Sequence, residues 1–520
     1  MKKLVLCLPL LAFFSESRAQ NWSEDVASIL YNNCTVCHHT GGIGNMPLMT
    51  YDDAFAFQAE IELYVSNGWM PPWIADTSFQ HYYDERTLTT YERTTILDWI
   101  AGGSPEGDAG LAPPPPVYNG SKILPGTPDL TVQMMPYMSK ATMGDDDYVC
   151  ISLPSGLLED KKLKAMEVIP GNYAAVHHVL VYHDADGSYG TDTVGGNCSG
   201  PTSEDLLGGY APGSQPTIYP SSVDWESGMQ MLAGAQIVLA MHYPHGSYGE
   251  WDSTKVNFYF YEEPMTAFRE VYSYPLIANM TFTIGAETID TVEDQFSIPS
   301  DLTFISALPH MHKLGMFIET YGLSGGVDTV PMVRIPQWDF DWQDIYCFEY
   351  LLPLMTGDDL YGRGIFDNTS LNPNNPNDPP VDVSWGLNTT DEMFLVYYAF
   401  MTYQAGDEYI SQDSLNTIFM SEELEKFEDP LSGIMVYPNP FEAEVSISYQ
   451  LTNAGIVNIY LYDTRGRVVR RLLRGEQQSQ GTQVVKWDGK DEKGVEVSRG
   501  LYYYSMTIDG APFSGRIVKK

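Results

Sequence analysis

The residues with the clearest chemical potential are histidines set in apolar runs that are typical of β-strands. His310 and His312 are separated by a single residue in such a run. Because alternate residues of a strand point to the same face, both imidazoles can bind one metal ion. The adjacent pair His177 and His178, and the single His242, lie in similar runs upstream. The pattern predicts metal sites built from imidazole nitrogen on a β framework.

Met393 offers a donor of a different kind. It follows Asp391 and Glu392 and opens another apolar run, residues 394–398. A thioether is a soft ligand, and beside two imidazoles it favours Cu(I), the state that reacts with dioxygen. The alternative for a lone methionine is packing in a hydrophobic core.

Taken in chain order, four segments resemble the copper type II, ascorbate-dependent monooxygenases, the family of the peptidylglycine hydroxylating and dopamine β-type enzymes. The resemblance covers about residues 127–402. The segments are Val176-His177-His178-Val179, Ala240-Met241-His242-Tyr243, Pro309-His310-Met311-His312 and Asp391-Glu392-Met393. It implies two copper ions, with dioxygen chemistry at one and electron storage at the other.

The resemblance assigns a role to each candidate residue. The implied copper ligands are His177, His178 and His242 in the first half of this region, and His310, His312 and Met393 in the second. A disulfide between Cys150 and Cys198 and a substrate-pocket role for Tyr397 are implied as well. His183 and His245 match no role and are expected at the surface.

The adjacent histidines raise a geometric question. Neighbouring residues of a strand face opposite ways, so His177 and His178 can share a metal only through a bulge or through different ring nitrogens. The alternative is one ligand histidine and one core or surface histidine.

Two departures from the family pattern bear on the substrate and on the disulfides. Peptide-amidating relatives place an arginine two residues before the His-x-His pair, and this chain has Leu308 there. Without that guanidinium the bidentate clamp for a carboxylate is missing, which disfavours a C-terminal glycine peptide as substrate. Phe394 follows Met393 where relatives often carry a cysteine, so Cys347 has no implied bridge.

The resulting hypothesis is hydroxylation of an organic substrate, small molecule or peptide, with O2 and an electron donor such as ascorbate. The metals would carry the redox chemistry, and the protein would supply ligands and orientation. The alternative, from another class, is a non-catalytic surface protein that uses the same fold for electron transfer or ligand binding.

A second cofactor is predicted near the N-terminus. Cys34-Thr35-Val36-Cys37-His38 has the spacing of a c-type haem attachment site, in which both thiols join the haem and the histidine binds iron,. A redox dithiol is the alternative. Met70 is the candidate for the opposite axial ligand, with Met46 and His81 as rivals, and a Met/His pair would raise the haem potential. We further predict that this unit, which resembles cytochromes c fused to bacterial copper monooxygenases, passes electrons to copper.

Composition limits the possible partners. The chain has 520 residues, 43% of them hydrophobic and 13% aromatic, so it can form several real cores,. A formal net charge of −40 argues against nucleic acid and anionic membranes as partners,. Lys2 and Lys3 precede a short apolar run, which is typical of a signal peptide ending near Gln20,. With no later apolar run long enough to form a transmembrane anchor, we expect a secreted or cell-surface protein.

These observations predict a mainly β protein of several units. The expected order is signal peptide 1–20, α-helical cytochrome c-like unit 21–104, Pro-rich linker 105–126, copper half 127–268, copper half 269–402, acidic linker 403–432 and tail 433–520. Both copper halves are expected to be antiparallel, jelly-roll-like β-sandwiches. The tail resembles the immunoglobulin-like sorting domain of type IX secretion, through Tyr437-Pro438-Asn439-Pro440 and Gly500-Leu501-Tyr502, and it implies that secretion machinery as a partner. Unlike the rest of the chain, the tail carries more Lys and Arg than Asp and Glu.

Overall fold

The computed structural model describes residues 20–412 and 434–520, apart from short gaps. The gaps are residues 84, 117, 119–123, 125, 143–145, 195–197, 199–204, 222–224, 263–266, 387–389, 442, 452, 464–467 and 509–510. Strands dominate the described chain and fall into several separate sheets, which confirms the mainly β class. The predicted signal peptide lies outside the described residues except for Gln20. None of the helices in the described ranges has the length and apolarity needed to cross a bilayer.

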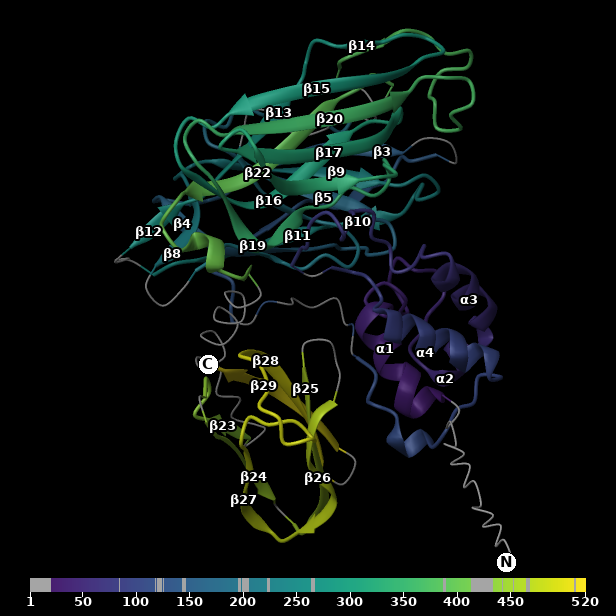
Figure 1. The fold of residues 1–520 in the computed structure, drawn as a ribbon, viewed down its shortest axis with the longest axis vertical. Coiled ribbons are helices and arrows are strands. Elements are labelled where there is room, and N and C mark those ends of the chain that lie inside the picture. Colours follow the sequence, from purple (N-terminus) through teal and green to yellow (C-terminus); the bar gives the residue numbers. More distant parts are fainter. Residues whose placement is uncertain are drawn as a thin grey trace, which may run out of the picture.

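The N-terminal residues form a small helical unit whose core includes Trp22 and Trp99 (Figure 1). Its elements are the π-helical turn η1 (Trp22–Val26), α1 (Ala27–Asn33), α2 (Tyr51–Ala56), α3 (Gln58–Ser66), α4 (Thr90–Ala101) and the 3-10 turn η2 (Ala109–Leu111). Both α2 and α4 begin at capping boxes, in which a threonine and an acidic side chain satisfy each other's backbone N–H groups,. The first turn is capped by Asn21, whose side chain accepts the N–H of Glu24.

Residues 130–270 form two larger sheets around one core, and the short strands β2 and β10 pair separately. The first sheet has the order β1-β11-β4-β8-β12, with β7 paired to β4, and the second has the order β3-β9-β5-β6. Phe258 of one sheet and Leu239 of the other lie in the same buried cluster. The strands are β1 (Leu130–Gln133), β2 (Tyr137–Met138), β3 (Asp147–Pro154), β4 (Lys161–Ile169), β5 (His178–Asp184), β6 (Asp205–Tyr210), β7 (Thr217–Ile218), β8 (Glu226–Met231), β9 (Gln236–Tyr243), β10 (Trp251–Asp252), β11 (Lys255–Phe260) and β12 (Phe268–Glu270).

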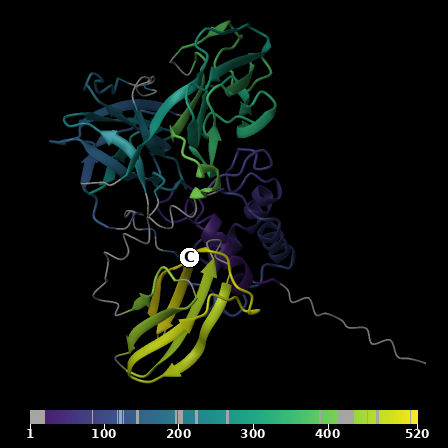
Figure 2. The same ribbon diagram turned by 60° about the vertical axis from the view of Figure 1, so that its left-hand side comes forward.

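Residues 272–402 form a second pair of sheets, which lies beside the first pair (Figure 2). Their orders are β13-β22-β16-β19 and β15-β20-β17-β18, and the short β14 and β21 pair separately. The strands are β13 (Tyr272–Ala278), β14 (Thr283–Ile284), β15 (Ile289–Ser297), β16 (Leu302–Met311), β17 (Gly315–Ser324), β18 (Asp328–Ile335), β19 (Tyr346–Leu354), β20 (Asp359–Asp367), β21 (Val383–Ser384) and β22 (Phe394–Thr402). Ile305 and Met401 of this pair are buried in the core of the first pair, so the two β units are packed together.

The helical unit also packs on the second β unit. Ala75 and Tyr82 are buried in the core of that unit, although both belong to the predicted haem unit. The Tyr82 hydroxyl donates to the carbonyl oxygen of Met332 at 3.0 Å, and Tyr82 forms an isolated β-bridge with Phe348 of β19. Ala75 and Tyr82 therefore anchor this part of the helical unit to the second β unit.

The described chain beyond β22 divides into two parts. The turn η3 (Asp407–Tyr409) and Gln412 fall in the predicted acidic linker, and they pack on the second β unit through bonds of Gln412 to Ile305 and of Asp407 to Thr303. The tail forms the sheets β23-β24-β27 and β26-β25-β28-β29 around a core of its own that includes Trp487. Its strands are β23 (Met435–Tyr437), β24 (Val445–Leu451), β25 (Gly455–Asp463), β26 (Val468–Gln478), β27 (Gly481–Trp487), β28 (Gly500–Ile508) and β29 (Ala511–Lys519).

Candidate metal sites

Three histidines converge where the central strands β9 and β5 of the β3-β9-β5-β6 sheet end and begin. His178 begins β5 and stands directly opposite His242 of β9 in the antiparallel register. His177 lies in the turn before β5, where its N–H donates to the carbonyl oxygen of His242 at 2.9 Å. Because His177 precedes the strand, the alternation of side chains does not turn it away from His178. The apolar run around His177 and His178, expected to be a strand, thus starts as strand only at His178, and no bulge is needed.

The ring nitrogens of this cluster have the spacing of a metal site. The Nδ1 atom of His178 lies 3.4 Å from Nδ1 of His177 and 3.2 Å from Nδ1 of His242. One ligand atom from each residue lies within 4.8 Å of the others. Nitrogens held about 2.0 Å from one ion in a trigonal arrangement are roughly 3.5 Å apart, and the two Nδ1–Nδ1 separations given above are close to that value,.

Burial favours the neutral imidazole, the form that binds metal, at two of the three histidines. Burial lowers the pKa of His177 to about 3 and holds that of His178 well below its usual value,. Nε2 of His242 lies 3.0 Å from a carboxylate oxygen of Asp146. Burial opposes ionisation of Asp146, yet its hydrogen bond and charge interaction with His242, the N–H of His245 and the charge of Lys313 together outweigh burial and lower the pKa to about 2. A carboxylate bound to Nε2–H leaves the Nδ1 lone pair of His242 facing the other two rings.

The second candidate site lies where β16 ends and β22 begins. His310 is on β16, His312 follows the strand by one residue, and Met393 immediately precedes β22. The register pairs His310 with Leu395, and continuing it sets His312 opposite Met393. The two β units of the chain thus each carry one candidate site at strand ends.

The two imidazoles of this second site are oriented through Nδ1. Nδ1 of His310 lies 2.6 Å from Oε1 of Gln343, and Nδ1 of His312 lies 3.0 Å from the carbonyl oxygen of Asp391. Since both acceptors require a proton on Nδ1, the Nε2 atoms keep the lone pairs needed for a metal. The ring planes are perpendicular, with centroids 5.1 Å apart.

Glu392 connects the ligand segments of the second site. Its carboxylate accepts the backbone N–H of His312 at 2.9 Å, of Met393 at 3.1 Å and of Leu314 at 2.6 Å. The side chain is fully buried, and burial raises its pKa to about 8 despite these bonds. Met393 is 1% exposed and lies in an apolar cluster with Leu308. One carboxylate therefore fixes the backbone of two candidate ligands together.

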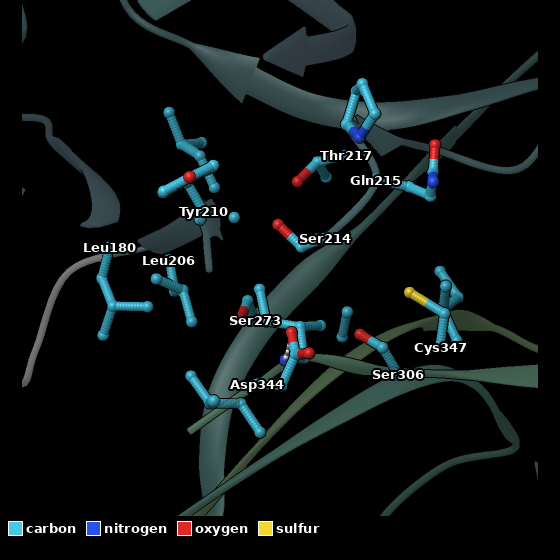
Figure 3. A pocket seen from close by; sticks show the side chains of 18 of the residues that line it. Leu180, Leu206, Tyr210, Ser214, Gln215, Thr217, Ser273, Ser306, Asp344 and Cys347 are labelled. Atoms are coloured by element: carbon cyan, nitrogen blue, oxygen red, sulfur yellow. Dashed lines mark hydrogen bonds between the residues drawn. The ribbon is translucent and has the colours of Figure 1, made fainter. Parts of the chain in front are cut away.

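A cavity of about 100 Å³ lies between the two β units (Figure 3). His178 and Leu180 of the first unit and Leu308 and Tyr397 of the second belong to its lining. Gln343, which orients His310, lines it too. The cavity thus touches the first candidate site through His178 and the second through Gln343, whereas His310, His312 and Met393 are not part of its lining. The substrate-pocket role of Tyr397 stays a prediction.

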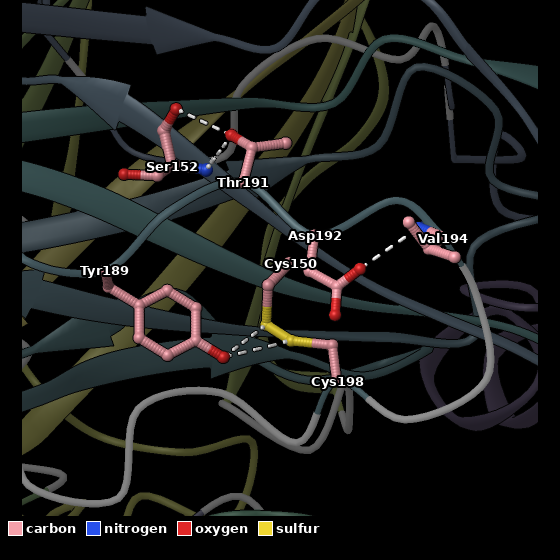
Figure 4. The surroundings of a disulfide bond; sticks show 7 residues. All are labelled: Cys150, Ser152, Tyr189, Thr191, Asp192, Val194 and Cys198. Atoms are coloured by element: carbon pink, nitrogen blue, oxygen red, sulfur yellow. Dashed lines mark hydrogen bonds between the residues drawn. A yellow bond between two sulfur atoms is a disulfide. The ribbon is translucent and has the colours of Figure 1, made fainter.

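The predicted disulfide is present (Figure 4). Cys150 of β3 is bonded to Cys198, with their Cα atoms 5.5 Å apart. Both cysteines are buried, and the hydroxyl of Tyr189 approaches both sulfur atoms at 3.5 Å. The bridge ties the chain after β5 to the sheet that carries His242.

The residues of the predicted haem motif lie in the helical unit. Cys34 and Cys37 are thiols, and Nδ1 of His38 lies 3.0 Å from the carbonyl oxygen of Met46. That bond leaves Nε2 of His38 for iron, as a proximal histidine requires. His81, a rival axial ligand, pairs with Glu85 instead, and its side chain is 65% exposed.

Met70, the preferred axial candidate, is half-buried just after α3 and forms a cis peptide bond with Pro71. Haem binding and the opposite axial ligand stay predictions. His245, expected at the surface, is 65% exposed in its side chain. The same expectation for His183 is wrong, because His183 is 2% exposed and its Nε2 accepts the N–H of Leu232.

Several residues that build these sites carry no ligand signature in the sequence. Asp146 and Gln343 are 96 and 33 positions from the histidines they orient. Only the fold brings them together, so spacing could not reveal them. Glu392 did carry a signal, because it directly precedes a candidate ligand and the apolar run that follows it.

Two family models match parts of the chain. The copper type II ascorbate-dependent monooxygenase, C-terminal domain, matches residues 276–419, a range that contains His310, His312 and Met393. The FlgD Ig-like domain matches residues 440–511 of the tail. No curated protein gave a match.

Solved structures resemble the chain only remotely. PorZ of the type-IX secretion system of Porphyromonas gingivalis is 20% identical over 24% of this chain and 15% of its own, with a TM-score of 0.14. A β-glucuronidase of Parabacteroides merdae is 11% identical over 45% and 28%, with a TM-score of 0.13. Latent PorU of Porphyromonas gingivalis is 8% identical over 73% and 34%, with a TM-score of 0.13. The chain spans about a third or less of each protein, and the TM-scores are too low to support an argument.

Proposed function

We propose that this chain is an exported copper-dependent monooxygenase that hydroxylates an organic substrate with O2. The observation that carries the proposal is the convergence of His177, His178 and His242 through Nδ1. This cluster lies outside the segment that matches the copper monooxygenase family, yet it borders the same cavity as Leu308 and Tyr397 inside that segment. Two independent features therefore point to the same chemistry.

In this proposal the two β units, each a β-sandwich, hold one copper ion each. His177, His178 and His242 are the ligands of one, and His310, His312 and Met393 are those of the other. Bound copper would supply the one-electron and dioxygen chemistry that side chains lack.

The surrounding residues keep the ligands in place and exclude water. Asp146 and Gln343 hold the tautomers of His242 and His310, and Glu392 fixes the backbone at Met393. Tyr397, 6% exposed and with its pKa raised by burial to about 12, stays protonated and can donate a hydrogen bond to substrate. A dry, rigid surrounding strengthens every such interaction.

We further propose that the helical unit binds haem c through Cys34, Cys37 and His38, and feeds electrons to copper in place of, or in addition to, ascorbate. A Cβ atom added to Gly213 would lie 3.5 Å from Sγ of Cys37, and the neighbouring Ala211 lines the cavity. The predicted haem attachment site thus abuts the loop between β6 and β7, which forms part of the cavity wall. This contact between the helical unit and the cavity wall supports the proposed electron route.

The export part of the proposal depends on the two ends of the chain. The predicted signal peptide would direct the chain out of the cytoplasm. The Cys150–Cys198 disulfide is stable in the oxidising environment outside,. The tail, similar to an Ig-like domain over residues 440–511, would act as the type IX sorting domain. In a host that has that system, deleting residues 433–520 should abolish secretion of the protein without reducing its amount inside the cells.

Metal analysis of the purified full-length protein tests the central proposal. After copper loading and removal of excess metal, we expect two copper ions and one iron per chain. His242→Ala and Met393→Ala should each lose about one copper, whereas His245→Ala, a change at an exposed neighbour, should lose none. Two coppers retained in both ligand variants would refute the assignment.

Rapid mixing tests the electron route. When the pre-reduced protein meets O2 and a hydroxylatable substrate, the haem absorbance should change to that of the oxidised form during turnover. The copper-depleted protein is the control and should reoxidise far more slowly. A haem that stays reduced while product forms would exclude it as the donor.

A further inference from the structure

We infer that the cavity between the β units binds an uncharged, amphipathic organic molecule. Its apolar end would point toward the candidate copper ligands, and its hydroxyl, amide or carbonyl end would point away from them. The inference rests on the proposed function, because it names the substrate class of the same site.

Two paired strands set the direction of the cavity. In the β16–β22 register, Ser306 stands opposite Ala399, Leu308 opposite Tyr397, and His310 opposite Leu395. Alternate residues of a strand share a face, so Ser306, Leu308 and His310 follow one another along the same side. Four residues of strand span about 13 Å, and the cavity lining includes Ser306, Leu308, Tyr397 and Ala399,. A molecule lying along these strands runs from Ser306 toward His310.

Apart from His178 and Gln343 themselves, the lining nearest the candidate ligands includes apolar side chains. Leu180 lies two residues beyond His178 on β5, and Leu308 lies two residues before His310 on β16. Leu180 and Leu206 stand together on one side of the cavity (Figure 3). A C–H bond presented to the metals here would come from an apolar part of the substrate, which gains free energy by leaving water.

The opposite side is polar but carries no charge. Gln215, Ser306 and Cys347 lie there, with the hydroxyl groups of Ser214 and Thr217 close by (Figure 3). Hydroxyl and amide groups can both donate and accept hydrogen bonds, so they suit an alcohol, amide or carbonyl group. The polarity of the lining therefore changes along its length, as an amphipathic ligand requires.

The one acidic side chain of the described lining, Asp344, already has a cationic partner. Asp344 forms an ion pair with Arg86 of the helical unit, and the guanidinium also lies over the ring of Trp73 at 5.2 Å. Among the described lining residues no lysine or arginine is present. A carboxylate would lose its water there without gaining a cation, and an ammonium group would have to displace Arg86 from Asp344. Both ionic classes are disfavoured.

A matched series of probes tests the inference on the copper-free, full-length protein. Calorimetry would compare 4-phenylbutan-1-ol, 4-phenylbutyrate and 4-phenylbutylamine, which share one apolar body and differ only in the end group. We expect the alcohol to bind at least tenfold more tightly than either ion. Equal or tighter binding of an ion, or no binding of the alcohol, would overturn the inference.

Two substitutions connect the result to the cavity. Leu308→Arg should raise the affinity for 4-phenylbutyrate at least tenfold and weaken binding of the alcohol, whereas Leu371→Arg, at an 89% exposed leucine, should change neither. Should Leu308→Arg fail to fold, Ser306→Ala offers a milder test. This substitution should weaken binding of the alcohol severalfold and leave binding of butylbenzene unchanged. Alcohol binding that is unaffected by Ser306→Ala would contradict the inference.

This experiment separates the inference from the proposed function. Probe binding is measured without copper, so it reports on the cavity alone. If the histidine and methionine variants keep their copper while the alcohol binds as expected, the proposed function fails and the ligand class stands. If copper is lost as expected but the ions bind best, the ligand class fails and the proposed function stands.

Discussion

At the scale of single residues, each candidate ligand depends on a neighbour that fixes its orientation. Asp146 bonds to Nε2 of His242, and Glu392 accepts the backbone N–H groups of His312 and Met393. Outer groups of this kind typically alter metal affinity about 10–100-fold when they are removed. They therefore offer tests that leave the ligands themselves unchanged.

The substitution Glu392→Gln should weaken Cu(I) binding at the Met/His site about 10–100-fold. An amide keeps one acceptor oxygen but turns an NH2 group toward backbone N–H groups that need an acceptor. Competition with a chromophoric Cu(I) chelator measures the change. Glu159→Gln, at an exposed side chain, is the matched control, and equal affinities in both variants would contradict the role given to Glu392.

The substitution Asp146→Asn should act on the other site. Without the carboxylate, His242 loses the partner that keeps the proton on Nε2, so binding through Nδ1 should weaken by a similar factor,. Cu(II) titration followed by electron paramagnetic resonance would report both affinity and ligand geometry. Asp186→Asn, on an exposed loop, is the control. An unchanged spectrum and affinity in Asp146→Asn would rule out this orienting role.

At the scale of elements, the candidate ligands occur where strands begin or end. His178 opens β5, His312 follows β16 and Met393 precedes β22. Strand runs and ligand types were readable from the sequence, because apolar alternation and spacing are local properties. Three other features could not be read from the sequence, because each depends on contacts between distant segments. They are the turn at His177, the burial of His183 and the insertion of Ala75 and Tyr82 into the core of the second β unit.

Removing the disulfide should destabilise the first β unit without abolishing its sheet. For a sequence separation of 48 residues, the chain-entropy estimate gives a loss of about 4 kcal/mol in Cys150→Ser/Cys198→Ser,. Urea unfolding, followed by tryptophan fluorescence, measures the loss. Addition of a thiol reductant should lower the midpoint of the wild type toward that of the variant and leave the variant unchanged. If the urea midpoint of the double variant equalled that of the oxidised wild type, the bridge would have no stabilising role.

At the scale of the whole molecule, the two β units and the helical segment are held as one assembly around the cavity. Arg269, from the last strand of the first unit, forms a buried ion pair with Asp407 beyond β22, with side chains 6% and 3% exposed. Asp407 also accepts the hydroxyl of Thr303 at 2.6 Å. This contact between the units could not be read from the sequence, in which Asp407 lies within a predicted linker.

The substitution Asp407→Asn should lower the free energy of unfolding by about 3–5 kcal/mol, because Arg269 would remain buried without its counter-charge. Burial raises the pKa of Asp407, but hydrogen bonds from Arg269 and Thr303 outweigh this and leave it lowered. The wild type should therefore lose stability as pH falls below about 4, where the unfolded chain takes up the proton first. Thermal unfolding between pH 3 and 7 measures both effects. If the free energy of unfolding of Asp407→Asn followed the same dependence on pH as that of the wild type, the role given to Asp407 would be contradicted.

X-ray absorption at the copper edge of the Cu(I)-loaded protein tests the central claim most directly. The account predicts two coppers per chain, nitrogen scattering from imidazoles and a sulfur scatterer at half occupancy that disappears in Met393→Ala. Met135→Ala, at an 81% exposed methionine, should keep the sulfur signal. A spectrum without sulfur, or one whose sulfur signal survives Met393→Ala, would contradict the account.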